Sequence, residues 1–292
     1  MAEPRQDLIE MLAREAATPV HPWVAAAAEV VRARHGDAVR ALVFYGACLR
    51  DNDPVGLLDF YVLVGRYGDA YDNWLAAAAN RLLPPNVFYL ETPWEGAVVR
   101  IKYAVMSLDQ FARGALPQAL QPMIWARFAQ PARLVYSADD HARRVVAVAQ
   151  ADALTTLMAV TRRLLPDEAR PEVLWPRAFA ETYRAELRPE PPGRAGQLYE
   201  ADRARYDRLT PLALADGGGG APWRLRRMVG KALNGARLIK AAFTFDGAVD
   251  YLLWKIERHS GIGVTATPWQ RRHPLLAAPG LIWRLYRLGA FR

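Results

Sequence analysis

Residues 44–64 read FYGACLRDNDPVGLLDFYVLV, and this stretch decides the fold. Apolar runs at 39–46 and 58–64 flank a segment rich in Asp, Asn, Pro and Gly, so they predict two short buried strands joined by a loop. The second run carries a single carboxylate, Asp59, among apolar side chains. A buried carboxylate without a partner is costly, so the sequence predicts a metal ion, an arginine or a lysine beside Asp59.

Outside this stretch, apolar periodicity predicts further strands and helices. Strands are expected at 86–91 and 97–106, with a Pro-Trp-Glu-Gly turn between them, and strand signals nearly vanish after residue 108. Helices are expected at 7–15, 22–35, 70–83, 108–129, 139–165, 172–186, 197–209 and 279–292, and residues 223–258 are expected to form one or two helices. This order predicts an α+β fold, with a compact mixed-sheet part followed by a mostly helical part.

The composition is that of a globular protein. Of the 292 residues, 52% are hydrophobic and 23% are charged. No stretch of 18 or more apolar residues is free of charge, and the N-terminal MAEPRQDLIEML has early acids and no apolar signal core. We therefore expect neither a spanning helix nor export. The single cysteine, Cys48, excludes an internal disulfide and a zinc site built from several cysteines.

The positive charge is concentrated in the last quarter of the chain. The net charge is +8, and residues 221–292 alone carry 13 basic and three acidic side chains. Such a segment is expected to seek an anionic partner, either nucleic acid or an anionic lipid surface. A glycine linker at 216–220 precedes it. We therefore expect three parts, over 1–136, 137–216 and 217–292.

The stretch that opens this section also indicates a chemistry. Enzymes that transfer a nucleotide hold a divalent metal with carboxylates at one edge of a small sheet, after a strand that ends in glycine and a small residue. Here Tyr45, Gly46 and Ala47 match the turn, and Asp59 matches half of the usual pair of carboxylates, with Tyr61 in the place of the second. The alternative is an ordinary strand–turn–strand in which Asp59 has a local structural role. Asp51 and Asp53 have the same i,i+2 spacing but belong to the loop.

Further motifs raise the specificity of this pattern. The segments VRIKYAVMSLDQF (99–111), MIWARFAQPARLVY (123–136) and ETYRAELRPE (181–190), with the basic stretch LNGARLIKAAFTFDGAVDYLLWKI (233–256), resemble the mitochondrial-type phosphatidate cytidylyltransferase family in content and in order. LLDFYVLV also fits the family's pattern of one aspartate followed by phenylalanine. The resemblance covers roughly residues 40–258.

The resemblance implies a fold, a reaction and a site. It implies a nucleotidyltransferase domain of the polymerase-beta type, a winged-helix-like second domain and a membrane-docking C-terminal helix. The reaction would convert CTP and phosphatidic acid into CDP-diacylglycerol and pyrophosphate with Mg²⁺, on the inner face of a bacterial inner membrane. Carried over by position, Tyr45, Gly46 and Ala47 would face the triphosphate, Asp59 would bind the metal, and Lys102 would contact phosphates.

Three departures from the family pattern stand beside this resemblance. Ala47 replaces a serine, and Gly65-Arg66-Tyr67 stands where the family has an acidic pair. VFYLE differs from the family's strand, although Glu91 there would be a natural second metal ligand. Lys102, without the resemblance, would be interpreted as a lysine at a sheet edge that extends to solvent.

The last helix indicates a membrane interface. In PGLIWRLYRLGAFR, Arg284 and Arg287 share a helix face, while Trp283 and Tyr286 stand among apolar residues. Aromatic and basic side chains around an apolar face are typical of an interfacial helix. The alternative is a helix packed on the protein core.

Three functions remain open at this point. The first is the peripheral cytidylyltransferase, and the second is a non-catalytic protein that keeps the fold and binds anionic lipid. The third is a nucleotidyltransferase that acts on another acceptor. No nucleic-acid partner is expected, because the aromatic residues near the basic ones lie on apolar faces and form no base-stacking platform.

Overall fold

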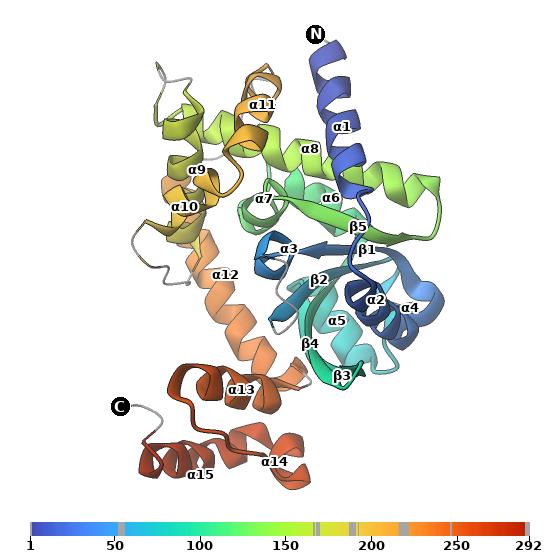
Figure 1. Cartoon of the computed structure of the whole chain (residues 1–292), viewed down its shortest axis with the longest axis vertical. Coiled ribbons are helices and arrows are strands. Elements are labelled where there is room, and N and C mark those ends of the chain that lie inside the picture. The colour runs from blue at the N-terminus through green and yellow to red at the C-terminus, as the bar shows by residue number, and fades with distance from the viewer. Residues whose placement is uncertain are drawn as a thin grey trace.

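The protein is an α+β structure with a five-stranded mixed sheet, seen in a computed structural model (Figure 1). The structure describes residues 2–51, 56–165, 167, 170–186, 191, 193–215, 222–245 and 247–289. The predicted linker at 216–220, Asp53 and the end of the ETYRAELRPE motif at 187–190 lie outside these residues. The strands are β1 (Val39–Tyr45), β2 (Leu57–Val64), β3 (Asn86–Trp94), β4 (Ala97–Ser107) and β5 (Ala132–Ser137), in the order β3-β4-β2-β1-β5.

The helices account for most of the remaining chain. In the first half they are α1 (Ala2–Ala16), α2 (Pro22–His35), α3 (Ala47–Asp51), α4 (Tyr67–Ala70), α5 (Trp74–Leu82), α6 (Leu108–Ala115) and α7 (Met123–Phe128). In the second half they are α8 (Asp140–Arg162), α9 (Pro171–Ala185), α10 (Arg194–Glu200), α11 (Arg203–Leu214), α12 (Trp223–Thr244), α13 (Ala248–Ser260), α14 (Pro268–Arg272) and α15 (Pro274–Arg287).

The sheet is apolar on both faces because helices cover both. One core contains Tyr61 and Leu63 of β2 with side chains from α1, α6, α8, α9 and α11. The other contains Phe60 and Val62 with side chains from α2 and α4. Successive side chains of a strand project to opposite faces, so a strand buried on both sides reads as a continuous apolar run. This explains LLDFYVLV, and it places Asp59 on the face of the α8 core.

Several boundaries differ from those expected. The predicted helix at 108–129 is two helices, α6 and α7, separated by a segment that contains Pro117 and Pro122. The 70–83 helix is divided because the Asn73 side chain accepts a hydrogen bond from the Leu75 amide and starts α5 anew. The 197–209 helix is likewise two, α10 and α11, and the last helix begins at Pro274 rather than at 279.

One strand escaped the sequence analysis. β5 pairs antiparallel with β1 at the sheet edge, and most of its residues are only half-buried. A short edge strand with little burial leaves a weak apolar signal, so the expectation that strands nearly vanish after residue 108 was wrong there.

The helical middle of the chain packs directly on the sheet. After β5, the described residues from 138 to 215 form helices and connecting loops and contain no strand, so the predicted helical character is confirmed and no β-hairpin wing is seen among them. α8 is long and apolar enough to cross a membrane, but 72% of its apolar window is buried as the central helix of the core. The division into three parts at 136 and 216 stays a prediction.

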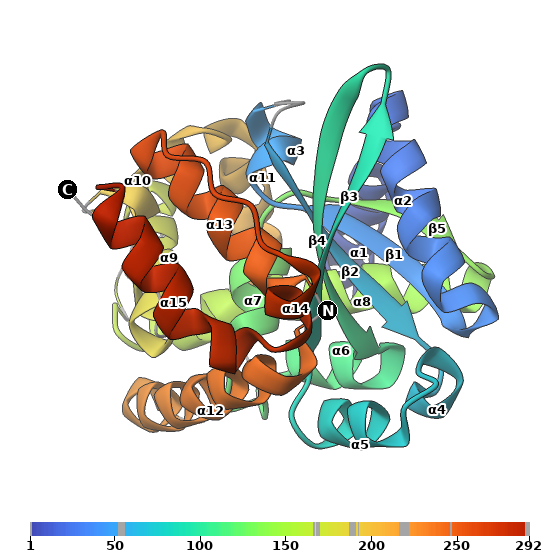
Figure 2. The same cartoon turned by 90° about the horizontal axis from the view of Figure 1, so that it is seen from below.

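The last three helices form a small core of their own. It joins α13 to α15 through seven buried side chains: Val249, Leu253, Val264, Ala266, Ala277, Leu281 and Leu285. Figures 1 and 2 show α13, α14 and α15 grouped below the sheet, with α12 leading to them from the helical part. The basic segment therefore folds beside the sheet.

Candidate functional site

Four polar side chains form a row across the sheet on the face of the α8 core. Tyr45 of β1 lies opposite Asp59 of β2, Asp59 lies opposite Lys102 of β4, and Lys102 lies opposite Tyr89 of β3. Lys102 Nζ donates to Asp59 Oδ1 at 3.0 Å. Their side chains are 31% and 20% exposed. The partner that the buried carboxylate required is therefore a lysine, one of the alternatives left open by the sequence.

The position of Lys102 excludes the edge interpretation. β4 lies between β3 and β2, so Lys102 is on an interior strand. Asp59 raises the pKa of Lys102 more than burial lowers it. Burial and the same carboxylate raise the pKa of Tyr45. At neutral pH Lys102 is therefore protonated and Tyr45 is a neutral phenol.

Gly46 brings backbone onto this row. Its φ is +99°, a conformation that residues with a side chain rarely adopt, and a Cβ built there would lie 3.1 Å from Asp59 Oδ2. α3 follows at once from Ala47. The predicted strand–glycine–helix turn is confirmed, and glycine is needed because the carboxylate occupies the space of a side chain.

A polar pocket of about 440 Å³ opens at this end of the sheet. Gly46, Ala47, Asp59 and Lys102 line it together with residues that are distant in the sequence. Its basic side chains come from five elements: Arg50, Lys102, Arg127, Arg194 and Lys255. Its acidic side chains are Asp59 and Glu186, so cations outnumber anions and the pocket attracts negative charge.

An apolar pocket of about 340 Å³ adjoins the polar one, and Tyr45, Lys102, Arg127 and Glu186 line both. α12 forms its outer wall. Its apolar lining comprises Tyr45, Tyr61, Pro85, Val87, Ala104, Met123, Leu238, Ala241 and Phe245. Two further cations, Arg237 and Lys240, stand on α12 within it.

The two α12 cations fasten that helix to the loop before β3. Arg237 Nε donates to the Pro84 carbonyl at 2.7 Å, and Lys240 Nζ donates to the carbonyls of Pro85, at 2.8 Å, and Leu83. Burial, with the nearby Arg237, lowers the pKa of Lys240 to about 8. Two cations are thus held beside an apolar cavity by hydrogen bonds to neutral carbonyls, and Glu186 of the same lining acts electrostatically on Arg237.

Arg127 stands where the pockets meet. Its Nη1 donates to Glu186 Oε1 at 3.0 Å and to the Met123 carbonyl at 2.9 Å. The Arg127 and Glu186 side chains are 24% and 12% exposed. Arg127 therefore lines the site, whereas Arg133, which flanks the same sequence motif, instead lies 3.8 Å from Glu15.

The residues fit a magnesium ion only in part. Mg²⁺ is commonly held by one or two carboxylates together with substrate phosphates. Asp59 supplies one such carboxylate. Glu91 lines neither pocket: its Oε1 accepts from the Tyr89 hydroxyl at 2.6 Å and lies 3.4 Å from Arg100 Nε. Among the described residues, no group of three or more His, Cys, Asp or Glu side chains could hold a metal. The site thus fits an ion that arrives with a polyphosphate.

The membrane residues predicted in the last helix lie on its outer face. Arg284 and Arg287 are exposed, and Trp283 and Tyr286 are 63% and 64% exposed with their rings stacked. The inner face of α15 packs on α13 through Leu281 and other side chains. Packing on the protein therefore accounts for the inner face of α15, and the membrane role of its outer face stays a prediction.

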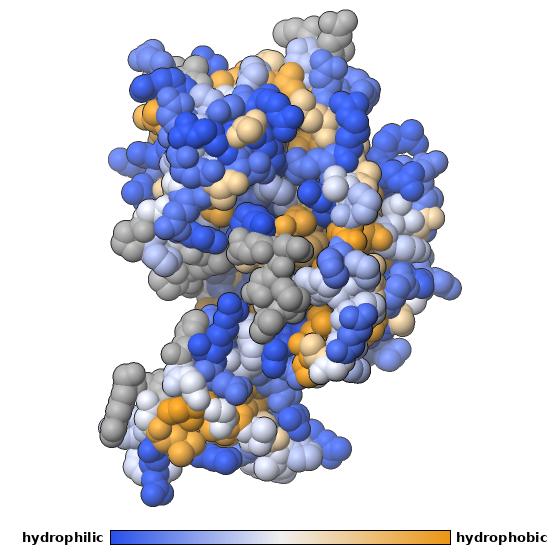
Figure 3. All heavy atoms as spheres, viewed as in Figure 1, coloured by the Kyte–Doolittle hydropathy of each residue, from blue (hydrophilic) through white to orange (hydrophobic). Residues whose placement is uncertain are grey.

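Exposed apolar side chains gather around these aromatic residues. On α13, α14 and α15 they are Leu252, Trp269, Leu276, Ile282, Trp283, Tyr286 and Leu288. Figure 3 shows an apolar patch at the lower end of the molecule, over these helices. A patch rimmed by basic residues is typical of an interaction surface.

Sequence reasoning missed much of the pocket lining. Arg50 and Arg194 carry no local motif, and Tyr251 belongs to the stretch at 233–256 without having been singled out. Lys240 and Lys255 belong to the basic C-terminal segment, whose charge was assigned to an outer surface. The clustering of positive charge in the sequence was the available signal. In the structure, part of this charge lines the pockets beside Asp59 and Lys102.

No protein-family model matches this chain, and no curated protein matches it significantly. Its function is therefore inferred from the geometry above.

Proposed function

We propose that this protein transfers a cytidylyl group from CTP to phosphatidic acid at an anionic membrane surface. The class is a nucleotidyltransferase, and the particular activity is that of a phosphatidate cytidylyltransferase. The observation that carries the proposal is the pair of adjoining pockets: one is polar and cationic around Asp59 and Gly46, and the other is apolar and cationic under α12. This pairing suits a triphosphate on one side and a phosphate with acyl chains on the other.

The residues divide the work as follows. Gly46 would let backbone approach the triphosphate. Lys102 and Arg127 would neutralise phosphate charge where the pockets meet, and Asp59 would hold Mg²⁺. Mg²⁺, when bound, would offset the charge that develops on the phosphate oxygens during transfer.

The reaction needs no protein nucleophile. An oxygen of the lipid phosphate attacks the α-phosphorus of CTP, the bond from that phosphorus to the bridging oxygen breaks, and pyrophosphate leaves with the bond's electrons. Arg237 and Lys240 would hold the acceptor phosphate, while the apolar lining of the same pocket would receive the start of the acyl chains. A cation on the acceptor and cations on the triphosphate reduce the repulsion between the two anions.

The outer face of α15 supports a peripheral position on the membrane. Trp283 and Tyr286 suit the headgroup region, and Arg284 and Arg287 suit anionic lipid. Phosphatidic acid would reach the apolar pocket from the bilayer to which these helices dock. We propose that this membrane is a bacterial inner membrane and that the protein docks on its inner, cytoplasmic face.

The test is CTP turnover on vesicles that contain phosphatidic acid, with Mg²⁺. We expect the wild type to form CDP-diacylglycerol and pyrophosphate, and Asp59→Asn to lose about 100-fold or more in rate. Glu91→Gln is the control, since Glu91 pairs with Arg100 and should keep the rate within about threefold. Absence of CDP-lipid from the wild type, or equal rates for wild type and Asp59→Asn, would overturn the proposal.

A second function is favoured by a specific observation. Lys102 already neutralises Asp59, and Ala47 has no hydroxyl, which suits a non-catalytic protein that binds anionic lipid. Calorimetry with Mg²⁺ and CTP separates the two: this alternative expects vesicle binding without nucleotide binding. Turnover of a nucleoside triphosphate with an RNA or protein acceptor, and none with lipid, would instead favour the third function.

A further inference from the structure

A third pocket, larger than the polar and the apolar one, lies at the other end of the sheet. Its volume is about 830 Å³, and it shares no lining residue with the polar and apolar pockets. Gly65, which follows β2, and Ser107, the last residue of β4, contribute to its lining, and these two strands are parallel. Gly65 is six residues beyond Asp59, so the pocket is about 20 Å from Asp59 at roughly 3.3 Å per strand residue.

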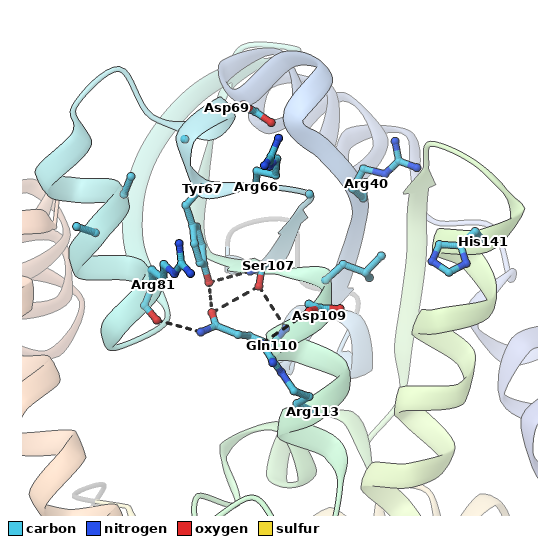
Figure 4. A pocket seen from close by; sticks show the side chains of 15 residues that line it. Arg40, Arg66, Tyr67, Asp69, Arg81, Ser107, Asp109, Gln110, Arg113 and His141 are labelled. Atoms are coloured by element: carbon cyan, nitrogen blue, oxygen red, sulfur yellow. Dashed lines mark hydrogen bonds and ion pairs between the residues drawn. The ribbon is translucent and has the colours of Figure 1, made fainter.

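Arginines surround this pocket, which we call the arginine pocket. They are Arg40 of β1, Arg66 after β2, Arg81 of α5 and Arg113 of α6, with His141 of α8 beside them. Figure 4 shows these side chains around the hollow, each from a different element. Since five separate segments supply them, their convergence is a property of the fold and is not a run of charge in the sequence.

Asp69 and Asp109 also line the arginine pocket, so its four arginines outnumber the carboxylates of its lining. Arg40 pairs with Asp139, and Arg113 lies 3.7 Å from Asp109, with both of the latter side chains mostly exposed. Arg66 and Arg81 have no ion pair with any carboxylate in the part of the chain that the structure describes. Two guanidinium groups at the pocket are thus available to an anion.

A network of hydrogen bonds connects helices that line the arginine pocket. The Tyr67 hydroxyl accepts from the Ser107 amide at 2.9 Å and donates to Gln110 Oε1. Gln110 Nε2 donates to the Arg81 carbonyl at 3.0 Å. Figure 4 shows this network between the arginines. It ties α4, α5 and α6 together, so the arginine pocket is preorganised without a ligand.

We propose that the arginine pocket binds an anion that carries a diphosphate group, at a site separate from the row of Asp59 and Lys102. Guanidinium groups bind phosphate oxygens in a bidentate manner, and two free arginines with two loosely paired ones match several phosphate oxygens. Tyr67, the tyrosine of the lining, is only 8% exposed, so it offers little ring face to a nucleobase. Recognition therefore centres on the phosphates.

The test is hydrogen exchange followed by mass spectrometry on the full chain, with inorganic pyrophosphate and EDTA. We expect pyrophosphate to slow exchange in peptides that cover 65–70 and 107–113. In Arg66→Ala/Arg81→Ala that protection should disappear, with affinity for this site reduced about tenfold or more. Both residues are exposed, so the variant should fold, and its melting temperature checks this.

Two further variants make the result specific. Gly68 lines the pocket, and a Cβ built there meets no atom within 4 Å, so Gly68→Trp should block the pocket with every arginine intact. Arg208→Ala is the matched control, because this exposed arginine bonds only to the Ala204 carbonyl of its own helix and lines none of the three pockets. It should leave protection unchanged.

The same experiment with pyrophosphate and, in parallel, with CDP identifies the class of ligand. Equal protection by pyrophosphate and CDP identifies the diphosphate group alone as the ligand, and stronger protection by CDP identifies a nucleoside diphosphate. The proposal is overturned if neither anion protects these peptides, or if protection survives in both Arg66→Ala/Arg81→Ala and Gly68→Trp. Because exchange is read peptide by peptide, binding near Asp59 does not obscure the outcome.

Discussion

Lys102 and Asp59 occupy directly opposite positions on the parallel strands β4 and β2, and the Lys102 ammonium donates to the Asp59 carboxylate at 3.0 Å. Lys102 lines both the polar and the apolar pocket, and Asp59 lines the polar one. The carboxylate on β2 is thus held by a lysine of the neighbouring strand. When a polyphosphate binds with Mg²⁺, Asp59 would pair with the metal and Lys102 with a phosphate in place of their present contact. The pair is therefore the first target for mutation.

A double-mutant cycle tests whether the pair acts as a unit. We expect Asp59→Asn and Lys102→Met each to reduce turnover about 100-fold, and the double variant to be little worse than either. The coupling in unfolding free energy should be about 1 kcal/mol or less, because both side chains keep contact with solvent. Urea unfolding and initial rates measure the two terms. Rate losses that multiply in the double variant would contradict this expectation.

Gly46 should tolerate no side chain. We expect Gly46→Ala to lower the unfolding free energy by about 1–3 kcal/mol, because φ is +99° and the new Cβ would press on the Asp59 carboxylate. The rate should fall as well, since Asp59 must shift. Gly196→Ala is the control: Gly196 is helical and its Cβ would meet nothing within 4 Å, so stability should hold or rise. Equal effects of the two changes would refute the close contact.

Gly247 fastens α13 to the sheet. Its φ is +81°, and a Cβ there would overlap the carbonyl oxygen of Tyr89 on β3. We expect Gly247→Ala to loosen the C-terminal helices and to speed tryptic cleavage within residues 248–289. Gly261 has a similar positive φ, but a Cβ there would meet no atom within 4 Å. Gly261→Ala therefore measures the effect of backbone strain without a clash. If both variants are cut at the same rate, contact with Tyr89 does not hold α13 in place.

The buried Lys240 should give a pH dependence. Its pKa of about 8 lies below the unfolded value of about 10.4, so between these values the unfolded chain binds more protons and stability rises with pH. We therefore expect the melting temperature of the wild type, relative to Lys240→Met, to rise from pH 8 to pH 10. Lys102, whose pKa is raised, acts in the opposite sense: its stabilisation is complete at neutral pH and is lost as pH rises through that raised pKa. Parallel curves for wild type and Lys240→Met would rule out the buried cation as the cause.

The outer face of α15 should bind anionic vesicles. We expect Trp283→Ala/Tyr286→Ala and Arg284→Glu/Arg287→Glu each to weaken binding about tenfold or more in vesicle sedimentation, the second pair more strongly at low salt. Trp74→Ala is the control, because Trp74 is 74% exposed on α5, away from this patch. Vesicle binding that none of these changes affects would remove α15 from the membrane model.

The sequence by itself determined most of the elements and the centre of the site. The apolar runs around Gly46 and Asp59 specified two paired strands, since local periodicity and turn residues suffice for that. They also required a partner for the buried carboxylate, because an unpaired charge in a strand is too costly. The metal, nucleotide and lipid assignments stay predictions. β5 was missed because a half-buried edge strand leaves little periodicity, and α6 and α7 were merged although prolines separate them.

Only the tertiary structure decided which groups meet. Lys102 is 43 residues from Asp59, and the parallel register of β2 and β4 makes it the partner. The apolar pocket exists because α12 crosses to the loop before β3, and the arginine pocket exists because separate elements bring arginines to one end of the sheet. Such contacts join distant segments through packing and register, which leave no local pattern in a single sequence.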